Sequence, residues 1–369
     1  MRRLLGAAGL LGLASCGGPA LAGSMVPAPA AEEIAWSFFL IGDTGDPEAA
    51  ADPTFAALES AARHAPDRTT IIFLGDNVYP AGLPASGDEG RANAERVLDV
   101  HLGAVQRSGA QAFFVLGNHD WAGGVGAARR QAAWIAERSG GAVVVLPAAG
   151  CPGPASRDVG GVRLVFLDTD WWLREDGGGP ECVPTDSAGV VDSLAAAIAG
   201  AGSSPVLVLA HHPLASGGRH GGHFGWRHHL FPLTDLARWA WLPLPVIGSL
   251  YPLARTSGMS QQDFSGGRNR AMRGALAEAF ARRAPAAYVA GHEHAIQVIR
   301  GAASPWFLVS GGGSTGNGTF VARTDSTRYA SLANGWIRVD RLVDGRLRVS
   351  VVEATPAAAA ETWSDWMGR

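Results

Sequence analysis

Lysine is absent from this sequence of 369 residues, so all 30 of its basic residues are arginines. With 33 acidic residues the formal net charge is −3, and charged side chains make up only 17% of the chain. Proteins that bind nucleic acids present a dense basic surface to the phosphate backbone, which a nearly neutral chain without a basic run does not provide. The composition therefore argues against a nucleic-acid partner.

Cysteine and long apolar runs are scarce as well. Three cysteines exclude a disulfide-rich scaffold and a zinc module built on thiolates. The apolar stretch from Leu4 to Leu13 is too short to cross a bilayer. Hydrophobic residues nevertheless make up 47% of the chain, so its length and apolar content suffice for a full-sized core, and disorder is not expected.

The N-terminus has the pattern of an export signal. Two arginines precede the apolar stretch, and the sequence Leu13-Ala14-Ser15-Cys16 resembles the bacterial lipobox. We expect residues 1–15 to be a lipoprotein signal peptide, with Cys16 lipidated and the protein anchored to a membrane at the cell envelope or periplasm. An ordinary secretory signal, cut a few residues later, is the alternative. Residues 16–33 are rich in glycine, proline and alanine and predict a flexible tether.

Short apolar runs alternate with helical stretches along most of the chain. The runs are rich in Val, Ile and Phe, as buried strands are, and they end at residues 41, 74, 116, 167, 210 and 290. This alternation predicts an α/β fold, followed by consecutive strands near the C-terminus. We place the folded domain at residues 34–356 and expect residues 357–369 to be a loose C-terminal tail.

Five of the apolar runs are followed directly by a short polar motif. Ligand sites in open α/β sheets lie beyond the carboxyl ends of the strands, so we expect these motifs to converge. Burying their carboxylates, amide and imidazoles without partners would be costly, and metal ions held by oxygen and nitrogen ligands, such as Zn, Mn or Fe, remove that cost. The motifs are Gly42-Asp43-Thr44-Gly45, Gly75-Asp76-Asn77-Val78-Tyr79, Gly117-Asn118-His119-Asp120, His211-His212-Pro213 and Gly291-His292-Glu293-His294.

This ordered set resembles the calcineurin-like metallophosphoesterases, and within them the purple acid phosphatase branch. Most of that superfamily has Asp-x-His at the first motif, whereas Asp43 is followed here by Thr44 and Gly45. Tyr79, three residues after Asp76, stands in for the missing histidine ligand. The resemblance implies a four-layer α/β/β/α sandwich with mixed sheets, and makes residues 34–356 a metallophosphoesterase catalytic domain.

The resemblance also implies two metal ions that share Asp76. Tyr79, as a phenolate, suits Fe(III), and the second metal would be Zn, Mn or Fe(II). His119 would lie beside the substrate as the catalytic residue that stabilises charge or protonates the leaving group. The implied metal ligands are Asp43, Asp76, Tyr79 and His294 for one ion, and Asp76, Asn118, His211 and His292 for the other.

The implied activity is the hydrolysis of phosphate monoesters, as in acid phosphatases, by a hydroxide that bridges the two metals. The phosphate ester would be the substrate partner. A phosphodiesterase, a nucleotide pyrophosphatase or a lipid-phosphate phosphatase with the same core is the alternative within the enzymes. A non-enzymatic envelope binding protein is the alternative outside them.

More histidines follow the fourth motif. His220 resembles a family histidine that contacts the substrate phosphate, and His223 and Arg219 are further candidate substrate contacts. We interpret the remaining polar residues near these motifs as supporting structure, namely His212, His228, His229 and the pair Asp168-Thr169.

Two features lie outside the motifs. Residues 239–252 form an apolar insertion with three prolines, which excludes a membrane helix. It is either a lid or core loop, or an exposed patch that touches lipid or an apolar substrate. Cys151 and Cys182 lie in loops around one predicted strand, and in an oxidising envelope we expect a disulfide between them, with two free thiols as the alternative.

Overall fold

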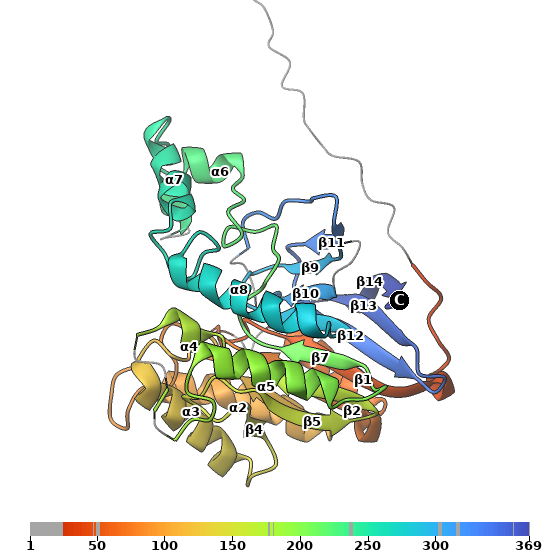
Figure 1. The fold of residues 1–369 in the computed structure, drawn as a ribbon. Coiled ribbons are helices and arrows are strands. Elements are labelled where there is room, and N and C mark those ends of the chain that lie inside the picture. The colour runs from red at the N-terminus through yellow and green to blue at the C-terminus, as the bar shows by residue number, and fades with distance from the viewer. Residues whose placement is uncertain are drawn as a thin grey trace, which may run out of the picture.

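Two seven-stranded sheets face each other in the computed structural model of this chain (Figure 1). The predicted signal peptide, the lipidation site Cys16 and the first part of the tether lie outside the described residues. The structure describes residues 25–46, 48, 52–175, 178–179, 181–235, 239–301, 305–314, 318–356 and 358–368.

The first sheet is mixed, with the strand order β14-β13-β12-β1-β2-β3-β4. Strands β1 to β4 run parallel, and β12 joins β1 antiparallel on its other side. Its strands are β1 (Ile34–Ile41), β2 (Thr69–Leu74), β3 (Gln111–Val115), β4 (Val144–Val145), β12 (Gly335–Leu342), β13 (Leu347–Ala354) and β14 (Ala359–Trp366).

The second sheet is also mixed, with the order β11-β9-β10-β8-β7-β6-β5. The parallel strands β6, β7, β8 and β10 form its centre, and antiparallel strands lie at both edges. Its strands are β5 (Ala155–Val159), β6 (Val162–Phe166), β7 (Val206–Leu209), β8 (Ala287–Ala290), β9 (Ile296–Ile299), β10 (Trp306–Ser310) and β11 (Thr327–Ser331).

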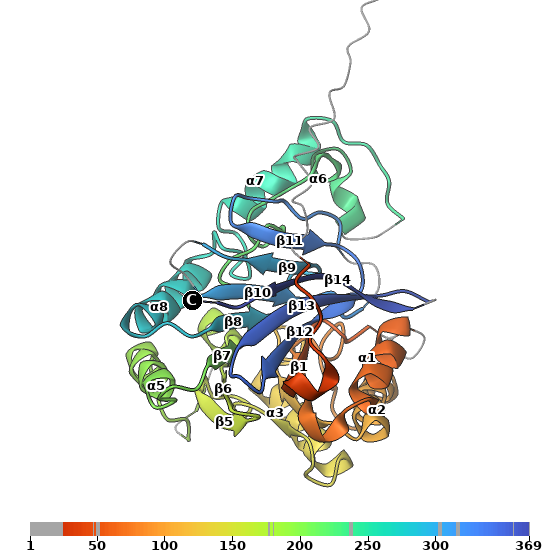
Figure 2. The same cartoon turned by 90° about the vertical axis from the view of Figure 1, so that its right-hand side faces the viewer.

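Helices cover the outer faces of both sheets. Figure 2 shows α1 and α2 against the first sheet and α5 and α8 against the second, which confirms the four-layer α/β/β/α arrangement. The α-helices are α1 (Pro53–Arg63), α2 (Arg91–Ser108), α3 (Gly124–Arg138), α4 (Asp170–Leu173), α5 (Ser187–Ala199), α6 (Trp226–Leu230), α7 (Leu250–Thr256) and α8 (Gly267–Arg282). The 3₁₀ helices are η1 (Ala31–Glu33), η3 (Pro66–Arg68), η4 (Pro232–Asp235) and η5 (Ile247–Ser249).

Strand β1 illustrates how the sequence produces these layers. Phe38 and Leu40 point into the core between the two sheets, whereas Phe39 and Ile41 pack on the opposite face beneath the helices. Successive strand side chains alternate between faces, so a strand buried on both sides has an unbroken apolar run. The helices of the described chain are too short or too polar to span a bilayer.

The C-terminal segment corrects one expectation. Residues 357–369 were predicted to be a loose tail, but Ala359–Trp366 form strand β14, which pairs antiparallel with β13. Trp363 is buried in the core between the sheets, and this anchors the strand. The alanine-rich start of the segment concealed the strand pattern. The last part of the predicted tether also contacts β14, through a bridge between Met25 and Ser364.

Cys151 and Cys182 form a disulfide across a sequence separation of 31 residues. The bond joins the loop before β5 to the loop before α5, so it closes a covalent ring around two strands and helix α4. Such a cross-link restricts the unfolded chain and thereby favours the folded state.

We predict that replacing both cysteines by serine lowers the free energy of unfolding by about 3 kcal/mol, because the unfolded chain regains its loop entropy. Urea unfolding of the oxidised wild type and of the Cys151→Ser/Cys182→Ser variant measures the difference. Reductant should lower the midpoint of the wild type and leave the variant unchanged. Equal midpoints for the two oxidised proteins would contradict a stabilising role.

Candidate metal centre

The polar motifs converge at one edge of the sandwich, beyond the carboxyl ends of five strands. Asp43 follows β1, Asp76 follows β2, Asn118 follows β3, His211 follows β7 and His292 follows β8. All of them except the half-buried Asn118 have side chains withdrawn from solvent. The parallel strands of both sheets therefore deliver these side chains to one place, as the sequence predicts.

The backbone at this edge is in an unusual conformation. Asp43, Asp76 and His292 have φ angles of 59°, 53° and 68°, in the left-handed region that non-glycine residues rarely adopt. Each turns the chain sharply at the end of its strand, so that the side chain faces the seam between the sheets. Such conformations cost of order 1 kcal/mol or more each and are typical of functional sites.

Four of these residues form what we call the His211 cluster: Asp76, Asn118, His211 and His292. His211 Nε2 lies 3.1 Å from Asn118 Oδ1 and 3.4 Å from an oxygen of Asp76. His292 Nδ1 lies 3.0 Å from the same Asn118 oxygen and 3.2 Å from His211 Nε2. Four potential ligand atoms thus surround one point.

Backbone carbonyls fix the tautomers of both histidines in this cluster. His211 Nδ1 donates to the carbonyl of Leu74 at 2.8 Å, and His292 Nε2 lies 3.3 Å from the carbonyl of Gln262. In the neutral rings, His211 Nε2 and His292 Nδ1 therefore carry lone pairs, and both face the oxygen of Asn118. Lone pairs that point at one another need a cation between them.

The pKa values of Asp76 and His211 also show that the His211 cluster requires a positive charge. Burial by itself would lower the pKa of His211, but the adjacent Asp76 carboxylate raises it to about 10. Burial likewise would raise the pKa of Asp76, yet His211 and His119 hold it well below its ordinary value. In the protein without metal, a proton on His211 compensates the buried carboxylate.

Three further residues form the Tyr79 cluster: Asp43, Tyr79 and His294. The Tyr79 hydroxyl lies 3.0 Å from His294 Nε2 and 3.2 Å from Asp43 Oδ1, which is 3.4 Å from His294 Nε2. Burial and the nearby Asp43 carboxylate raise the pKa of Tyr79 well above its ordinary value, so the phenol stays protonated unless a cation is bound.

The donor set fits metal ions. Ligand atoms of Asp43, Asp76 and His211 lie within 4.8 Å of one another, which links the two clusters through Asp76. His212 is as close to His211 and His292, but its two ring nitrogens contact Thr169 Oγ1 at 2.8 Å and Gln262 Oε1 at 2.7 Å. His212 is therefore a support for the site, as the sequence suggested.

Asp120 is a supporting residue to which sequence reasoning assigned no role. Its fully buried carboxylate accepts hydrogen bonds from the backbone N–H groups of Gly117, Asn77 and Val78 at 2.8 to 3.2 Å, and from Gln131 Nε2 at 2.7 Å. Burial and the charge of Asp76 raise its pKa to about 6. Asp120 thus ties the β2 and β3 loops together, and its place directly after Gly-Asn-His was the available signal.

The predicted catalytic histidine lies at the open side of the centre. The side chain of His119 is 38% exposed, and its Nδ1 contacts the carbonyl of Pro80 at 2.6 Å. Its Nε2 is 3.9 Å from an Asp76 oxygen, and its ring meets Tyr79 edge-on. His119 is therefore held beside both clusters without belonging to either.

His220 also reaches the centre. Its ring centroid is 4.0 Å from that of His292, and its Nδ1 contacts Asp263 Oδ1 at 2.9 Å. Buried Glu293 accepts the backbone N–H of His220 at 3.1 Å. Asp263 and Gln262 come from the loop between α7 and α8, and no sequence signal pointed to them.

The other predicted residues have other neighbours. Arg219 Nη1 lies 3.6 Å from Asp235, and the backbone N–H of His223 closes a turn onto Gly218. Asp168 accepts a hydrogen bond from the buried indole of Trp121 at 2.8 Å, and burial raises the pKa of this carboxyl to about 8. The remaining supports behave similarly: His228 contacts Thr319, and His229 contacts Ser249.

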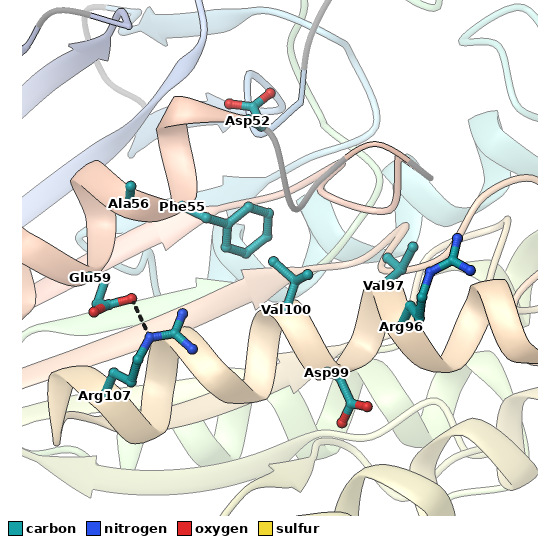
Figure 3. A pocket seen from close by; sticks show the side chains of 9 residues that line it. All are labelled: Asp52, Phe55, Ala56, Glu59, Arg96, Val97, Asp99, Val100 and Arg107. Carbon is teal, nitrogen blue, oxygen red and sulfur yellow. Dashed lines mark hydrogen bonds and ion pairs between the residues drawn. The ribbon is translucent and has the colours of Figure 1, made fainter.

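A separate hollow of about 470 Å³ lies between α1 and α2 (Figure 3). It is lined by side chains of both helices, among them Phe55 and Val100, and Arg107 at its rim is paired with Glu59. The strand-end residues described above do not line it.

Comparisons with known proteins point to one family. The sequence profile described as Calcineurin-like phosphoesterase matches residues 37–295, which include both clusters. No curated protein sequence matches the chain. Purple acid phosphatase PPD1 from yellow lupin (Lupinus luteus) seeds is similar in structure, with a TM-score of 0.50 and 12% identity over 89% of this chain and 53% of that chain.

A second similar structure is titled "GAP50 the anchor in the inner membrane complex of Plasmodium". Its TM-score is 0.48, with 15% identity over 90% of this chain and 88% of that one. The present chain spans about half the length of the lupin protein. At 12% identity the lupin structure shows a likeness of fold alone.

We predict that Gly117→Ala disrupts the His211 cluster, because the new methyl group would collide with the Asp76 carboxylate and approach the His211 ring. Metal affinity should fall roughly ten- to a hundredfold, as it does when the setting of a ligand is disturbed. Metal content after dialysis, read by mass spectrometry, measures the change.

Gly274→Ala is the matched control. This glycine is exposed on α8, where a Cβ atom meets open space. The control should keep its metal and gain about 0.5–1 kcal/mol of stability from the better helix former. Unchanged metal content in Gly117→Ala would argue against the geometry of the His211 cluster.

Proposed function

Because this chain belongs to the calcineurin-like phosphoesterase family, we propose that it is an acid-phosphatase-like enzyme that hydrolyses phosphate monoesters with two bound metal ions. One observation carries the proposal: two clusters of metal-binding donor atoms, the His211 cluster and the Tyr79 cluster, meet at the single carboxylate of Asp76. In such sites, a pair of metal ions polarises phosphoryl oxygens and activates water.

The protein's own residues have distinct tasks in this proposal. Asp43, Tyr79 and His294 hold one ion, Asn118, His211 and His292 hold the other, and Asp76 serves both. The backbone carbonyls at His211 and His292 engage one nitrogen of each ring, so Nε2 of His211 and Nδ1 of His292 face the ion site and the rings can bind without rearranging. A bound metal ion would displace the proton that His211 carries in its absence.

His119 is placed to transfer a proton to the leaving group. Because its Nδ1 is engaged by Pro80, the Nε2 atom remains available on the exposed side of the centre. As an imidazolium, Nε2–H can donate to the oxygen of the departing alcohol. His220 is the second candidate contact: Asp263 engages its Nδ1 and leaves Nε2 for a phosphate oxygen.

The identity of the metals is part of the proposal. Tyr79 is a hard oxygen donor, and a trivalent ion is the cation best able to overcome the raised pKa of this buried phenol. We therefore assign Fe(III) to the Tyr79 cluster, and Zn, Mn or Fe(II) to the His211 cluster.

The proposed location is the cell envelope. It is supported by the lipobox-like sequence ending at Cys16 and by the disulfide, a bond that persists in oxidising compartments. The substrate would then be a phosphate ester outside the cytosol, reached by a protein held on a membrane by its lipid.

Hydrolysis of p-nitrophenyl phosphate by the metal-loaded chain tests the activity. We expect turnover of this monoester to exceed that of bis-p-nitrophenyl phosphate, and Asp76→Asn to abolish both because it removes the ligand shared by the two ions. Faster turnover of the diester would mean that the protein is a phosphodiesterase and not a monoesterase. Absence of hydrolysis between about pH 4 and about pH 9 would leave a binding protein.

The iron assignment has its own test in the visible spectrum. We expect a tyrosinate-to-Fe(III) absorption band in the wild type, and its loss in Tyr79→Phe, since that variant lacks the phenolate oxygen. Metal analysis of the same samples provides the control. A colourless wild type containing only Zn or Mn would exclude iron while leaving the hydrolase proposal intact.

A further inference from the structure

Helices α6 and α7 stand away from the sandwich of sheets (Figures 1 and 2). The described residues of the segment 226–256 form what we call the apolar protrusion. Its large apolar side chains face solvent: Trp239 is 85% exposed and Val246 86%, and Trp241, Ile247, Leu250 and Leu253 are each more than half exposed. Isolated exposed apolar residues are ordinary, but six of them in one projecting segment are typical of an interaction site.

The charge of this segment differs from that of the rest of the chain. Residues 226–262 contain three arginines and one aspartate, a formal charge of +2, which leaves a formal charge of −5 for the remainder. No acidic residue occurs between Asp235 and Asp263. Both of these carboxylates are buried, at 4% and 3% side-chain exposure, and paired with arginines: Asp235 with Arg219, and Asp263 with Arg255. The charge of Arg255 is therefore compensated, and the excess positive charge of the segment comes from its other arginines.

Aromatic and basic groups are also combined in a specific way. The guanidinium of Arg227 lies over the ring of Trp241 at 4.5 Å, and Phe231 meets the same indole edge-on. Tryptophan and arginine share the boundary between lipid and water, where the indole enters the apolar region and the guanidinium reaches the phosphates.

We propose that the apolar protrusion docks onto the surface of an anionic phospholipid bilayer. The exposed side chains would enter the boundary of the headgroups and acyl chains, and Arg227, which lies over Trp241, would contact lipid phosphates. Prolines 243 and 245 keep this stretch from forming a spanning helix, so it rests on the surface. The docking is independent of the proposed hydrolysis.

The protrusion is rigidly connected to the metal centre. Arg255 on α7 forms a bidentate ion pair with Asp263, the residue that also engages His220 beside His292. A bilayer held by α7 would therefore lie at a fixed orientation to the open side of the site.

Vesicle binding by the full chain tests the proposal. Cys16→Ser is included in every protein, so that acylation contributes to none of them. The test variant is Trp239→Ser/Ile247→Ser/Leu253→Ser, three exposed positions whose change should spare the fold. The matched control is Val183→Ser/Leu332→Ser/Val343→Ser, which removes three exposed apolar side chains elsewhere.

Binding is measured by sedimentation with vesicles of equal parts phosphatidylglycerol and phosphatidylcholine. We expect the affinity of the test variant for these vesicles to be at least about tenfold lower than that of the parent. The control should bind as tightly as the parent does. Brominated phosphatidylglycerol should quench tryptophan fluorescence of the parent and the control more than that of the test variant. Hydrolysis of a soluble phosphate ester should be equal in all three.

Equal vesicle binding and quenching in the test variant and the control would overturn the proposal. So would self-association of the parent that the test variant lacks, seen by sedimentation velocity without lipid, because the occupant of the surface would then be a second copy. We expect the parent to bind vesicles of phosphatidylcholine alone more weakly than vesicles that contain phosphatidylglycerol. Equal binding to both would show that neither the arginines nor anionic lipid contributes, and would contradict that part of the proposal.

Discussion

The structure depends on one electrostatic constraint: carboxylates, imidazoles and an amide are buried together at the seam between two apolar sheets. Asp43 and Asp76 are almost fully enclosed, and backbone carbonyls hold His211 and His292 so that the other nitrogen of each ring is directed inward. Such a group is stable only with positive charge at its centre. In the absence of metal a proton on His211 serves this purpose, and proteins of the calcineurin-like phosphoesterase family meet the same need with two metal ions.

Much of the surrounding architecture enforces this convergence. Parallel strands from both sheets end at the same edge, left-handed residues turn the ligands inward, and Asp120 holds two of the loops through their N–H groups. Glycine at position 117 leaves room for the Asp76 carboxylate that any side chain would occupy. The same supports that strain the backbone locally prepare the site for its ligands, because the cost of ordering them is met during folding.

The fold and the convergence of the polar motifs could be predicted because their signals are local. An apolar run ending in Gly-Asp or Gly-His identifies a strand and the residue after it, and five such motifs in order indicate a shared edge. Asp263 and Gln262 could not be predicted, since they reach the site from an irregular loop whose path depends on tertiary packing. The tail was mistaken because β14 is defined by its partner β13 and by the burial of Trp363, not by its own alanine-rich sequence. The composition of the apolar insertion, residues 239–252, did not distinguish a lid from an exposed patch. Only the three-dimensional structure shows that its large apolar side chains are exposed.

Strand β1 is paired with β2 on one side and with β12 on the other, so Phe38 is aligned with both Thr70 and Val339. During translation β2 is synthesised early, whereas β12 is synthesised near the end of the chain. The strand that carries the first ligand, Asp43, keeps an open edge until the C-terminal hairpin has emerged, and folding must wait for contacts between the two ends of the chain. A polypeptide interrupted between His294 and Gly335 would contain every side chain assigned to the metals and still lack the strand that completes their scaffold. We therefore expect the complete metal centre to form only after the C-terminal hairpin has been synthesised.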